Sequence, residues 1–364
     1  MAMSKWLGPG FLASYRFVRV SRKTGYEVGA VKGIKSKTLS ICRDDDSDTK
    51  ESGSVEYAGR LDFGSDYMRV YLDATFHDGS KETVPLGTFM VSCPSVTADG
   101  SVSSGTAELD GRLKAASEDQ YEHPITVPAG ANAVEEAAKV LRGCGLTVVT
   151  EASSYKLGSP RTYGSDSDET ATKLEMANDL LALASFRDAW TDGNGVVHLT
   201  PINEPDATAP VWEFIEGRNA RFLSQVVEER DISSVKNLVR VTYSTQEKSF
   251  VGIARDDDPK SEFSTVTLGR VISVTERLSD VPDDASDQQI QTMANAKAKE
   301  LLTGAQSVAR IVKLVSAHCP VWYGDTVRID YASAGISGLF NVVSMSPSDP
   351  HGNMTELTLR RYER

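Results

Sequence analysis

A short strand pattern occurs twice in this chain, and it constrains the fold more than any other feature. Met-Arg-Val-Tyr at 68–71 leads to Gly-Thr-Phe-Met-Val at 87–91, and Val-Arg-Ile-Asp at 327–330 leads to Gly-Leu-Phe-Asn-Val at 338–342. An alternating strand followed by a Gly-x-Phe-x-Val strand, used twice, is typical of two related antiparallel barrels in one polypeptide. Coincidence is the alternative, because any strand that begins with glycine and alternates apolar residues matches the motif. Duplication and coincidence both remain open.

The length of the chain predicts more than one domain. At 364 residues it exceeds the ~250–300 at which single hydrophobic cores stop growing. With 40% apolar and 25% charged residues, the composition is that of an ordinary globular protein. No apolar run approaches the ~20 residues that cross a bilayer, so we expect no stable membrane insertion. Residues 1–10 have no long apolar core, so a secretory signal is not expected either.

The period of the apolar residues divides the chain into three parts. Strand-like alternation covers most of the chain up to residue 118 and returns after residue 206, while helical periods lie between. We therefore predict a mainly β fold with an α+β insertion, in which two related antiparallel β-barrels accompany a small α+β domain. The expected domains are a first β-barrel with a basic N-terminal segment over 1–118, the α+β domain over 119–205, and a second β-barrel with one packed helix over 206–364.

Capping residues mark where the helices begin. Asn132, Thr172 and Ser286 each precede an apolar stripe and have glutamate or glutamine three residues later. The last of these helices is expected over 286–303. We also expect a strand at 266–268 and a polar linker at 203–206.

Charge is distributed unevenly along the chain. Residues 1–37 contain eight basic residues and one acidic residue, a net +7, although the whole chain carries −12. Arg16, Arg19, Arg22 and Lys23 lie in this segment among valines, as in a strand with one solvated face. We predict that these four residues form an interface with an acidic neighbouring subunit, because strand edges commonly carry such charges. Contact with DNA is the alternative, but the acidic remainder would repel phosphates, so no specific nucleic-acid binding is expected.

No catalytic or metal motif is evident. The sequence has no Gly-x-Ser-x-Gly elbow, no His-Glu-x-x-His and no phosphate loop. The cysteines and histidines are dispersed, and the acidic runs at 44–48, 166–168 and 256–258 lack the spacing of a calcium loop. Adjacent acids such as Glu135 and Glu136 are usually solvated surface. We therefore expect no catalytic residue, no metal site and no cofactor.

The order of these features resembles the baseplate or tail-tip hub proteins of bacteriophages and related contractile injection machines. The resemblance covers residues 12 to 362, and it rests on the order of several motifs rather than on any single one. These motifs are the strands at 87–91 and 338–342, Glu-Leu-Asp-Gly-Arg-Leu at 108–113, Ala-Trp-Thr-Asp-Gly-Asn-Gly-Val at 189–196, Gly-Asp-Thr-Val at 324–327 and the closing strand at 354–359.

Membership of that family would imply a structural virion protein rather than an enzyme. Three subunits would place six quasi-equivalent barrels in a ring at the tip of the tail tube, and would adapt the sixfold tube to threefold tip components during assembly and genome delivery. The implied partners are the other subunits of a homotrimer, tail-tube or distal tail ring proteins, the tape measure protein, and tip, spike or receptor-binding proteins, with DNA passing through the channel. The implied location is the tail tip of the virion, after assembly in the host cytoplasm.

Two other interpretations remain open. A distal tail or adaptor protein would also be β-rich and non-catalytic, but it would close as a hexamer with one barrel per chain, whereas a hub closes as a trimer with two. A tail-associated cell-wall hydrolase would need two carboxyl groups ~5–10 Å apart across a cleft, and sequence alone does not place them.

Overall fold

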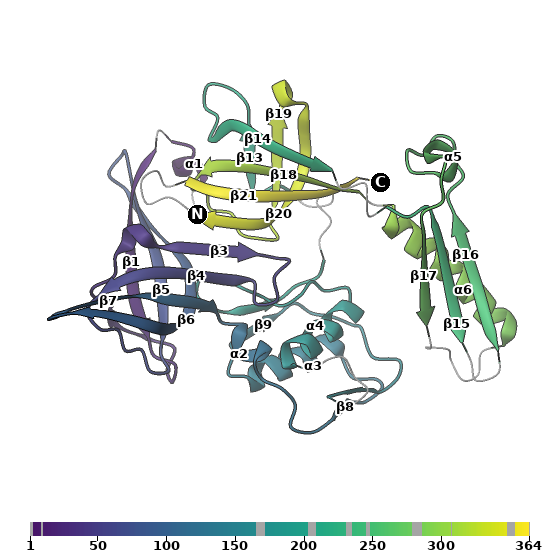
Figure 1. Ribbon diagram of the computed structural model, residues 1–364, viewed down its shortest axis with the longest axis horizontal. Helices are drawn as coiled ribbons and strands as arrows, with labels where there is room; N and C mark the ends of the chain where they lie inside the picture. The colour runs from purple at the N-terminus through teal and green to yellow at the C-terminus, as the bar shows by residue number, and fades with distance from the viewer. Residues whose placement is uncertain are drawn as a thin grey trace. The chain divides into compact units, whose positions relative to one another are not determined.

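The computed structural model describes residues 3–8, 10–164, 172–202, 209–230, 235–244, 248–278, 286–306, 308–347 and 354–363. The expected linker at 203–206 and the acidic run at 166–168 lie outside these ranges. The chain forms two compact units (Figure 1). Unit 1 consists of Met1–Val226 and Lys313–Leu359, and unit 2 consists of Val227–Val312 and Arg360–Arg364. In the described part of the chain, no helix is both long and apolar enough to span a membrane.

A sheet of 13 strands forms the framework of unit 1. Its hydrogen-bonded order is β14-β18-β21-β20-β3-β4-β7-β6-β5-β1-β2, with β19 joined to β20 and β13 joined to β19. The strands are β1 (Phe11–Val20), β2 (Glu27–Ala30), β3 (Ser40–Asp44), β4 (Glu51–Ala58), β5 (Tyr67–Phe76), β6 (Lys81–Asp99), β7 (Val102–Gly111), β13 (Trp212–Ile215), β14 (Phe222–Arg230), β18 (Val308–Ala317), β19 (Thr326–Tyr331), β20 (Ile336–Pro347) and β21 (Met354–Glu363). The prediction of a mainly β fold is confirmed.

The two copies of the sequence pattern have the same strand register. In each copy the glycine pairs with the third residue of the first motif, and the phenylalanine pairs with the first residue. These pairs are Val70–Gly87 and Met68–Phe89 in β5–β6, and Ile329–Gly338 and Val327–Phe340 in β19–β20. A Cβ atom on Gly87 would lie 2.4 Å from Cζ of Phe89, so the motif needs glycine where the buried ring folds back over the strand.

Backbone hydrogen bonds join the segment after β2 to strand β4. The amide N–H of Ala58 donates to the carbonyl of Gly33, and the amide N–H of Lys35 donates to the carbonyl of Glu56. We call strands β1 to β7 the first β region; because β4 also pairs with β7 and β3, these strands curl around one core. Val55 and Met68 belong to this core and are completely buried.

The first β region contacts the second β region, which consists of β13, β14 and β18 to β21, at several places. Strand β20 pairs with β3, so that the sheet is continuous between the regions. Trp6, in the short helix α1 (Met3–Trp6), is buried and makes edge contacts with the rings of Phe11, Phe76 and His318. The N-terminal segment thus joins β1 and β5 to the residue that follows β18.

The α+β part of unit 1 lies between β7 and β13. It contains α2 (Lys114–Ser117), β8 (Ile125–Val127), α3 (Ala133–Gly143), β9 (Val148–Thr150), β10 (Arg161–Tyr163), α4 (Lys173–Leu183), β11 (Trp190–Thr191) and β12 (Val197–Leu199). The helix starts are as predicted: Asn132 accepts hydrogen bonds from two amides of α3, and Thr172 forms a reciprocal capping box with Glu175. Leu141 and Leu180 are completely buried between these helices and the small strands.

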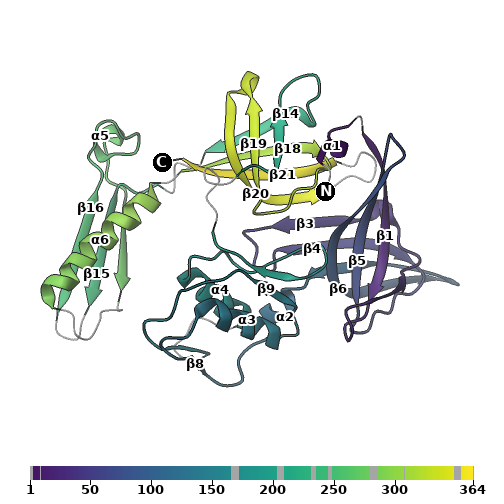
Figure 2. The ribbon, with the colours of Figure 1, turned by 180° about the vertical axis from the view of Figure 1, so that it is seen from behind.

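Unit 2 is a three-stranded sheet with one helix on it. The sheet has the order β16-β15-β17, from β15 (Leu238–Ser244), β16 (Ser249–Arg255) and β17 (Ser273–Leu278). Figure 2 shows α6 (Asp287–Ala305) lying across β15 and β16. The helix expected over 286–303 is present, with Ser286 in its capping box, but it packs on this small sheet.

One predicted strand is wrong. Residues 266–268 belong to the short helix α5 (Thr265–Leu268). The hydroxyl of Ser264 accepts a hydrogen bond from the amide of Thr267 and begins the turn, and Gly269 ends it with a left-handed φ of 63°. Local capping therefore outweighs the β preference of valine and threonine here.

Candidate assembly surface and buried junction

The predicted basic residues fall into two groups, of which the first is paired within the chain. Nε of Arg16 lies 3.1 Å from Oδ2 of Asp73, and Nε of Arg19 lies 2.7 Å from Oδ2 of Asp66. The hydrogen bond from Arg19 lowers the pKa of Asp66. Both pairs are partly exposed, and pairs of this kind contribute about 0–1 kcal/mol to stability. Arg16 therefore pairs with a residue of β5, and Arg19 pairs with Asp66, the residue that precedes β5.

The second group lies in a projecting turn. Arg22 and Lys23 are exposed in the connection between β1 and β2, where the amide of Ser21 donates to the carbonyl of Tyr26. Tyr26 is 78% exposed and Val28 is 64% exposed. Exposed apolar patches mark interaction sites, and aromatic residues and arginine are enriched in protein interfaces, so this turn is a candidate interface. We call residues 21–30 the basic hairpin.

Tyr26 and Val28 were not predicted as surface residues. In the sequence the charged residue Glu27 stands between them, which is the alternation of a strand that buries one face. All four residues of β2 are exposed, so here the alternation does not mark a buried face. Among the described strands β2 pairs with β1 alone, over three residue pairs, and its side chains remain in water.

A buried ion pair joins three parts of unit 1. Nε of Arg43 in β3 lies 3.3 Å from Oε1 of Glu51 in β4, and both side chains are 0% exposed. The hydroxyl of Thr191 in β11 donates to Oε2 of Glu51 at 2.8 Å. The amide of Thr191 donates to the hydroxyl of Tyr323, which follows β18, at 2.9 Å. The guanidinium of Arg43 lies 4.0 Å from the ring centroid of Trp322. We call these five residues the buried junction.

Burial shifts both charged groups of the junction toward neutrality. Desolvation raises the pKa of Glu51 to about 7, against the opposing attraction of Arg43 and the hydrogen bond from Thr191. Desolvation likewise lowers the pKa of Arg43. Nη1 and Nη2 of Arg43 are buried and have no hydrogen-bond partner among the described residues. The pair is therefore held by the surrounding fold, since removing charges from water opposes its formation.

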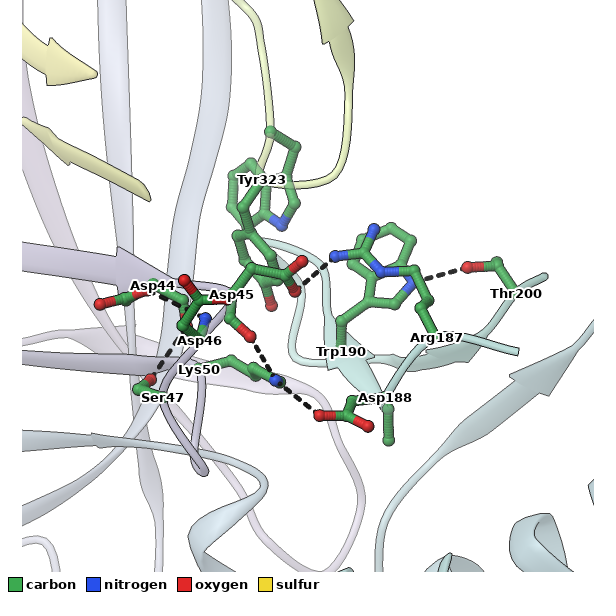
Figure 3. A network of polar contacts seen from close by, with 12 residues as sticks. Asp44, Asp45, Asp46, Ser47, Lys50, Arg187, Asp188, Trp190, Thr200 and Tyr323 are labelled. Atoms are coloured by element: carbon green, nitrogen blue, oxygen red, sulfur yellow. Dashed lines mark hydrogen bonds and ion pairs between the residues drawn. The ribbon is translucent and has the colours of Figure 1, made fainter. Parts of the chain in front are cut away.

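A second set of ion pairs surrounds the junction (Figure 3). Nη2 of Arg187 lies 2.6 Å from Oδ1 of Asp45, and Nζ of Lys50 lies 3.1 Å from Oδ2 of Asp188. Lys50 also donates to the carbonyl of Asp45. Lys50 has a left-handed φ of 62°, which only well-fixed surroundings maintain in a residue other than glycine. The acidic run 44–48, which lacks the spacing of a calcium loop, thus connects β3 to the α+β part.

The turn between β11 and β12 packs tightly on β6. A Cβ atom on Gly193 would lie 2.1 Å from the carbonyl oxygen of Pro85. The hydroxyl of Thr88 donates to the carbonyl of Gly193 at 3.2 Å, and Arg69 donates to the carbonyl of Asn194 at 2.9 Å. The glycine at this position is required by the close approach of two backbones.

The other residues considered for chemistry lie apart from this junction. Glu136 lies 3.2 Å from Lys139 on the surface of α3, and its neighbour Glu135 is exposed. The four cysteines are free. Over the ranges that the structure covers, no group of three or more His, Cys, Asp or Glu side chains is arranged to hold a metal ion.

Comparison with known proteins gives no match by sequence but clear matches by structure. No protein-family profile matches the chain, and no curated protein sequence matches it. The tail protein from Neisseria meningitidis MC58 superposes with a TM-score of 0.66 at 14% identity, over 96% of this chain and 97% of that chain. The 43 kDa tail protein of prophage MuSo2 from Shewanella oneidensis superposes with a TM-score of 0.61 at 10% identity, over 95% and 98%.

A chain of the Francisella PdpA–VgrG complex also shares the architecture. It superposes with a TM-score of 0.57 at 8% identity, over 99% of this chain and 60% of the longer Francisella chain. At identities this low, the superpositions establish a common fold, and function has to be argued separately. The resemblance seen in the sequence is confirmed at this level: the chain has the fold of the phage tail and baseplate-hub proteins.

Proposed function

We propose that this chain is a structural, non-enzymatic protein of a phage-type tail, and that it acts as the hub at the tip of the tail tube. The supporting observation is the extent of the structural likeness, which covers at least 95% of this chain and at least 97% of the Neisseria and Shewanella tail proteins. The likeness therefore extends over whole chains and is not confined to one module, and the role is inferred from it by analogy.

The proposed hub is a homotrimer. Two strand pairs with one register, β5–β6 and β19–β20, give each chain two similar β regions. If each region forms a barrel, three chains offer six similar surfaces, which is the number that a sixfold tail tube or distal tail ring requires. Threefold tip, spike or receptor-binding proteins would bind the opposite side. The tape measure protein and then DNA would pass through the channel, in a particle assembled in the host cytoplasm.

The three-domain division of 1–118, 119–205 and 206–364 is part of this proposal. In it, the buried junction keeps the first β region, the α+β part and the second β region in one rigid arrangement. Its members come from β3, β4, β11 and the loop after β18, so each part of unit 1 contributes at least one residue. A hub that transmits force along a tail needs such a fixed arrangement.

Native mass spectrometry of the purified chain, alone and with the tail-tube or distal tail protein encoded beside it, tests the subunit number. The mass of three chains supports the hub. The mass of six chains supports the adaptor ring instead, and a monomer that persists with both partners contradicts both. Clearing of a peptidoglycan gel by the purified chain would favour the hydrolase.

The predicted interface is tested at the basic hairpin. Reversing Arg22 and Lys23 to glutamate should reduce tail assembly in a complementation assay, because opposite charges guide and align assembly partners. Reversing Lys297 and Lys299 on α6 is the matched control, with the same change of charge in unit 2. Equal assembly by both double variants would exclude the basic hairpin as an assembly interface. Arg16 and Arg19 are expected to support the hairpin through their intrachain pairs rather than to contact a partner.

A further inference from the structure

A groove beside β13 is used neither by the buried junction nor by the basic hairpin. It has a volume of about 620 Å³, and its walls are Leu7, residues 210–213 and the segment 215–221 that follows the strand. Leu7 is 52% exposed and Ile215 is 47% exposed. The groove therefore presents apolar side chains that unit 1 leaves in water.

Strand β13 has a free edge along this groove. Within the described sheet it pairs with β19 alone, in parallel. The amide of Val211 donates to the carbonyl of Thr326, so strand geometry turns the backbone groups of Trp212 and Phe214 toward the other edge. An unpaired strand edge with apolar pockets beside it is the arrangement that binds an extended peptide as an added strand.

Two residues that line the groove have a buried donor without an acceptor in the described part of the chain. Trp212 is 3% exposed, and its Nε1 has no hydrogen-bond partner among the residues that the structure describes. Nε of Arg221 is also buried without a partner, although another nitrogen of this side chain donates to the carbonyls of Leu7 and Gly8. Both groups only donate, so they fit a ligand that offers oxygen acceptors.

The charges at the rim favour an acidic ligand. Oε1 of Glu213 lies 3.5 Å from Arg328, and Glu216 accepts a hydrogen bond from the amide of Ser333 at 3.0 Å. These acids are therefore engaged within unit 1. Arg218 is exposed, and within the described ranges no carboxylate forms an ion pair with it. Glu216 keeps its negative charge, and the exposed guanidinium of Arg218 offers a cation with which a ligand carboxylate can pair.

We propose that the groove binds an extended, acidic segment of a partner protein. The segment adds as a strand to the free edge of β13, places apolar side chains against Leu7 and Ile215, and sets a carboxylate beside Arg218. Binding of this kind derives orientation from the backbone hydrogen bonds and selectivity from the pocket and the charge. The proposal does not depend on subunit number, and it adds a peptide-binding site to the proposed hub.

The probe is a capped, fluorescently labelled eight-residue peptide that alternates valine and threonine around one central glutamate, compared with the same peptide carrying lysine there. Fluorescence anisotropy on the full chain should show saturable binding of the glutamate peptide. Ile215→Lys and Arg218→Glu should each weaken it about tenfold, and Trp212→Phe should weaken it less. Arg218→Glu should now prefer the lysine peptide. Arg240→Glu, at an exposed residue of unit 2, is the charge control.

Three results would overturn the proposal. The first is equal affinity for the two peptides, and the second is the absence of saturable binding up to millimolar concentration. In the third, Arg218→Glu changes the subunit number of the free chain, which would identify a second copy as the occupant. Circular dichroism spectra that match the unsubstituted protein ensure that a loss of binding by Ile215→Lys or Arg218→Glu reflects the groove and not unfolding.

Discussion

Removing Glu51 from the buried junction should destabilise unit 1 more than removing Arg43. An arginine side chain stays protonated in proteins, so Glu51→Leu leaves a cation that is completely buried and has no counter-ion. Breaking a buried pair in this way costs about 3–5 kcal/mol. Arg43→Met leaves the carboxyl group of Glu51 instead, and that group becomes neutral when it takes up a proton.

The pH dependence separates the two variants. The pKa of Glu51 is raised from the ordinary 4.5 to about 7 in the folded protein. The folded state therefore binds a proton that the unfolded state has released, and this contribution to stability is complete below pH 4.5 and is lost as the pH rises through 7. The attraction of Arg43 opposes the rise in the pKa of Glu51, so without Arg43 this loss of stability continues to higher pH. Arg43→Met should thus lose a further ~1.4 kcal/mol per pH unit just above pH 7, relative to the unsubstituted protein.

Urea unfolding followed by tryptophan fluorescence measures this. All four tryptophans, at positions 6, 190, 212 and 322, belong to unit 1, so the fluorescence reports on that unit alone. The double variant Arg43→Met/Glu51→Leu is the control, and it should be close to the unsubstituted protein because it buries no charge. The reasoning fails if Glu51→Leu is no more destabilising than Arg43→Met at pH 6, or if the gap between Arg43→Met and the unsubstituted protein is the same at pH 6 and pH 9.

Three further outcomes are expected. Gly193→Ala should destabilise unit 1 by about 1–3 kcal/mol in urea unfolding, because its Cβ would lie 2.1 Å from the carbonyl oxygen of Pro85; an unchanged midpoint would mean that the turn can shift. Asn237→Ala should lower the melting temperature of unit 2 in calorimetry, by about 1–3 kcal/mol of stability, since this completely buried amide accepts from the amide of Ile272 at 2.7 Å. Arg19→Ala should cost less than about 1 kcal/mol, as its pair with Asp66 is partly exposed, and a larger loss would mean that the pair is effectively buried.

Local features of the fold could be read from the sequence. The helix starts at Asn132, Thr172 and Ser286 were predictable because a cap and its helix interact within a few residues. The Gly-x-Phe-x-Val strands were predictable for the same reason, since the glycine at 87 accommodates the ring two residues later. The order of such local units was enough to indicate the fold.

Long-range features could not be read in this way. Arg43 and Glu51 look like ordinary solvated charges in an alternating strand, and they are buried only because β11 and the loop after β18 cover them. Asp45 likewise finds its partner, Arg187, 142 residues further along the chain. The free edge of β13 is a property of the whole sheet, and no pattern in its four residues marks it.

The placement of unit 2 in the chain has a consequence for how such proteins can vary. Unit 2 is inserted between β14 and β18, which are neighbours in the 13-stranded sheet. Contacts of Arg221 with Ala317 and of Glu228 with Arg310 align the two strands as in a hairpin. Topologically, the segment of unit 2 that runs from β15 to α6 is the loop of that hairpin, so its exchange for a short turn or for a different module would leave the order of the sheet unchanged. A lineage of such proteins could therefore acquire, lose or replace this part while keeping the rest of the architecture.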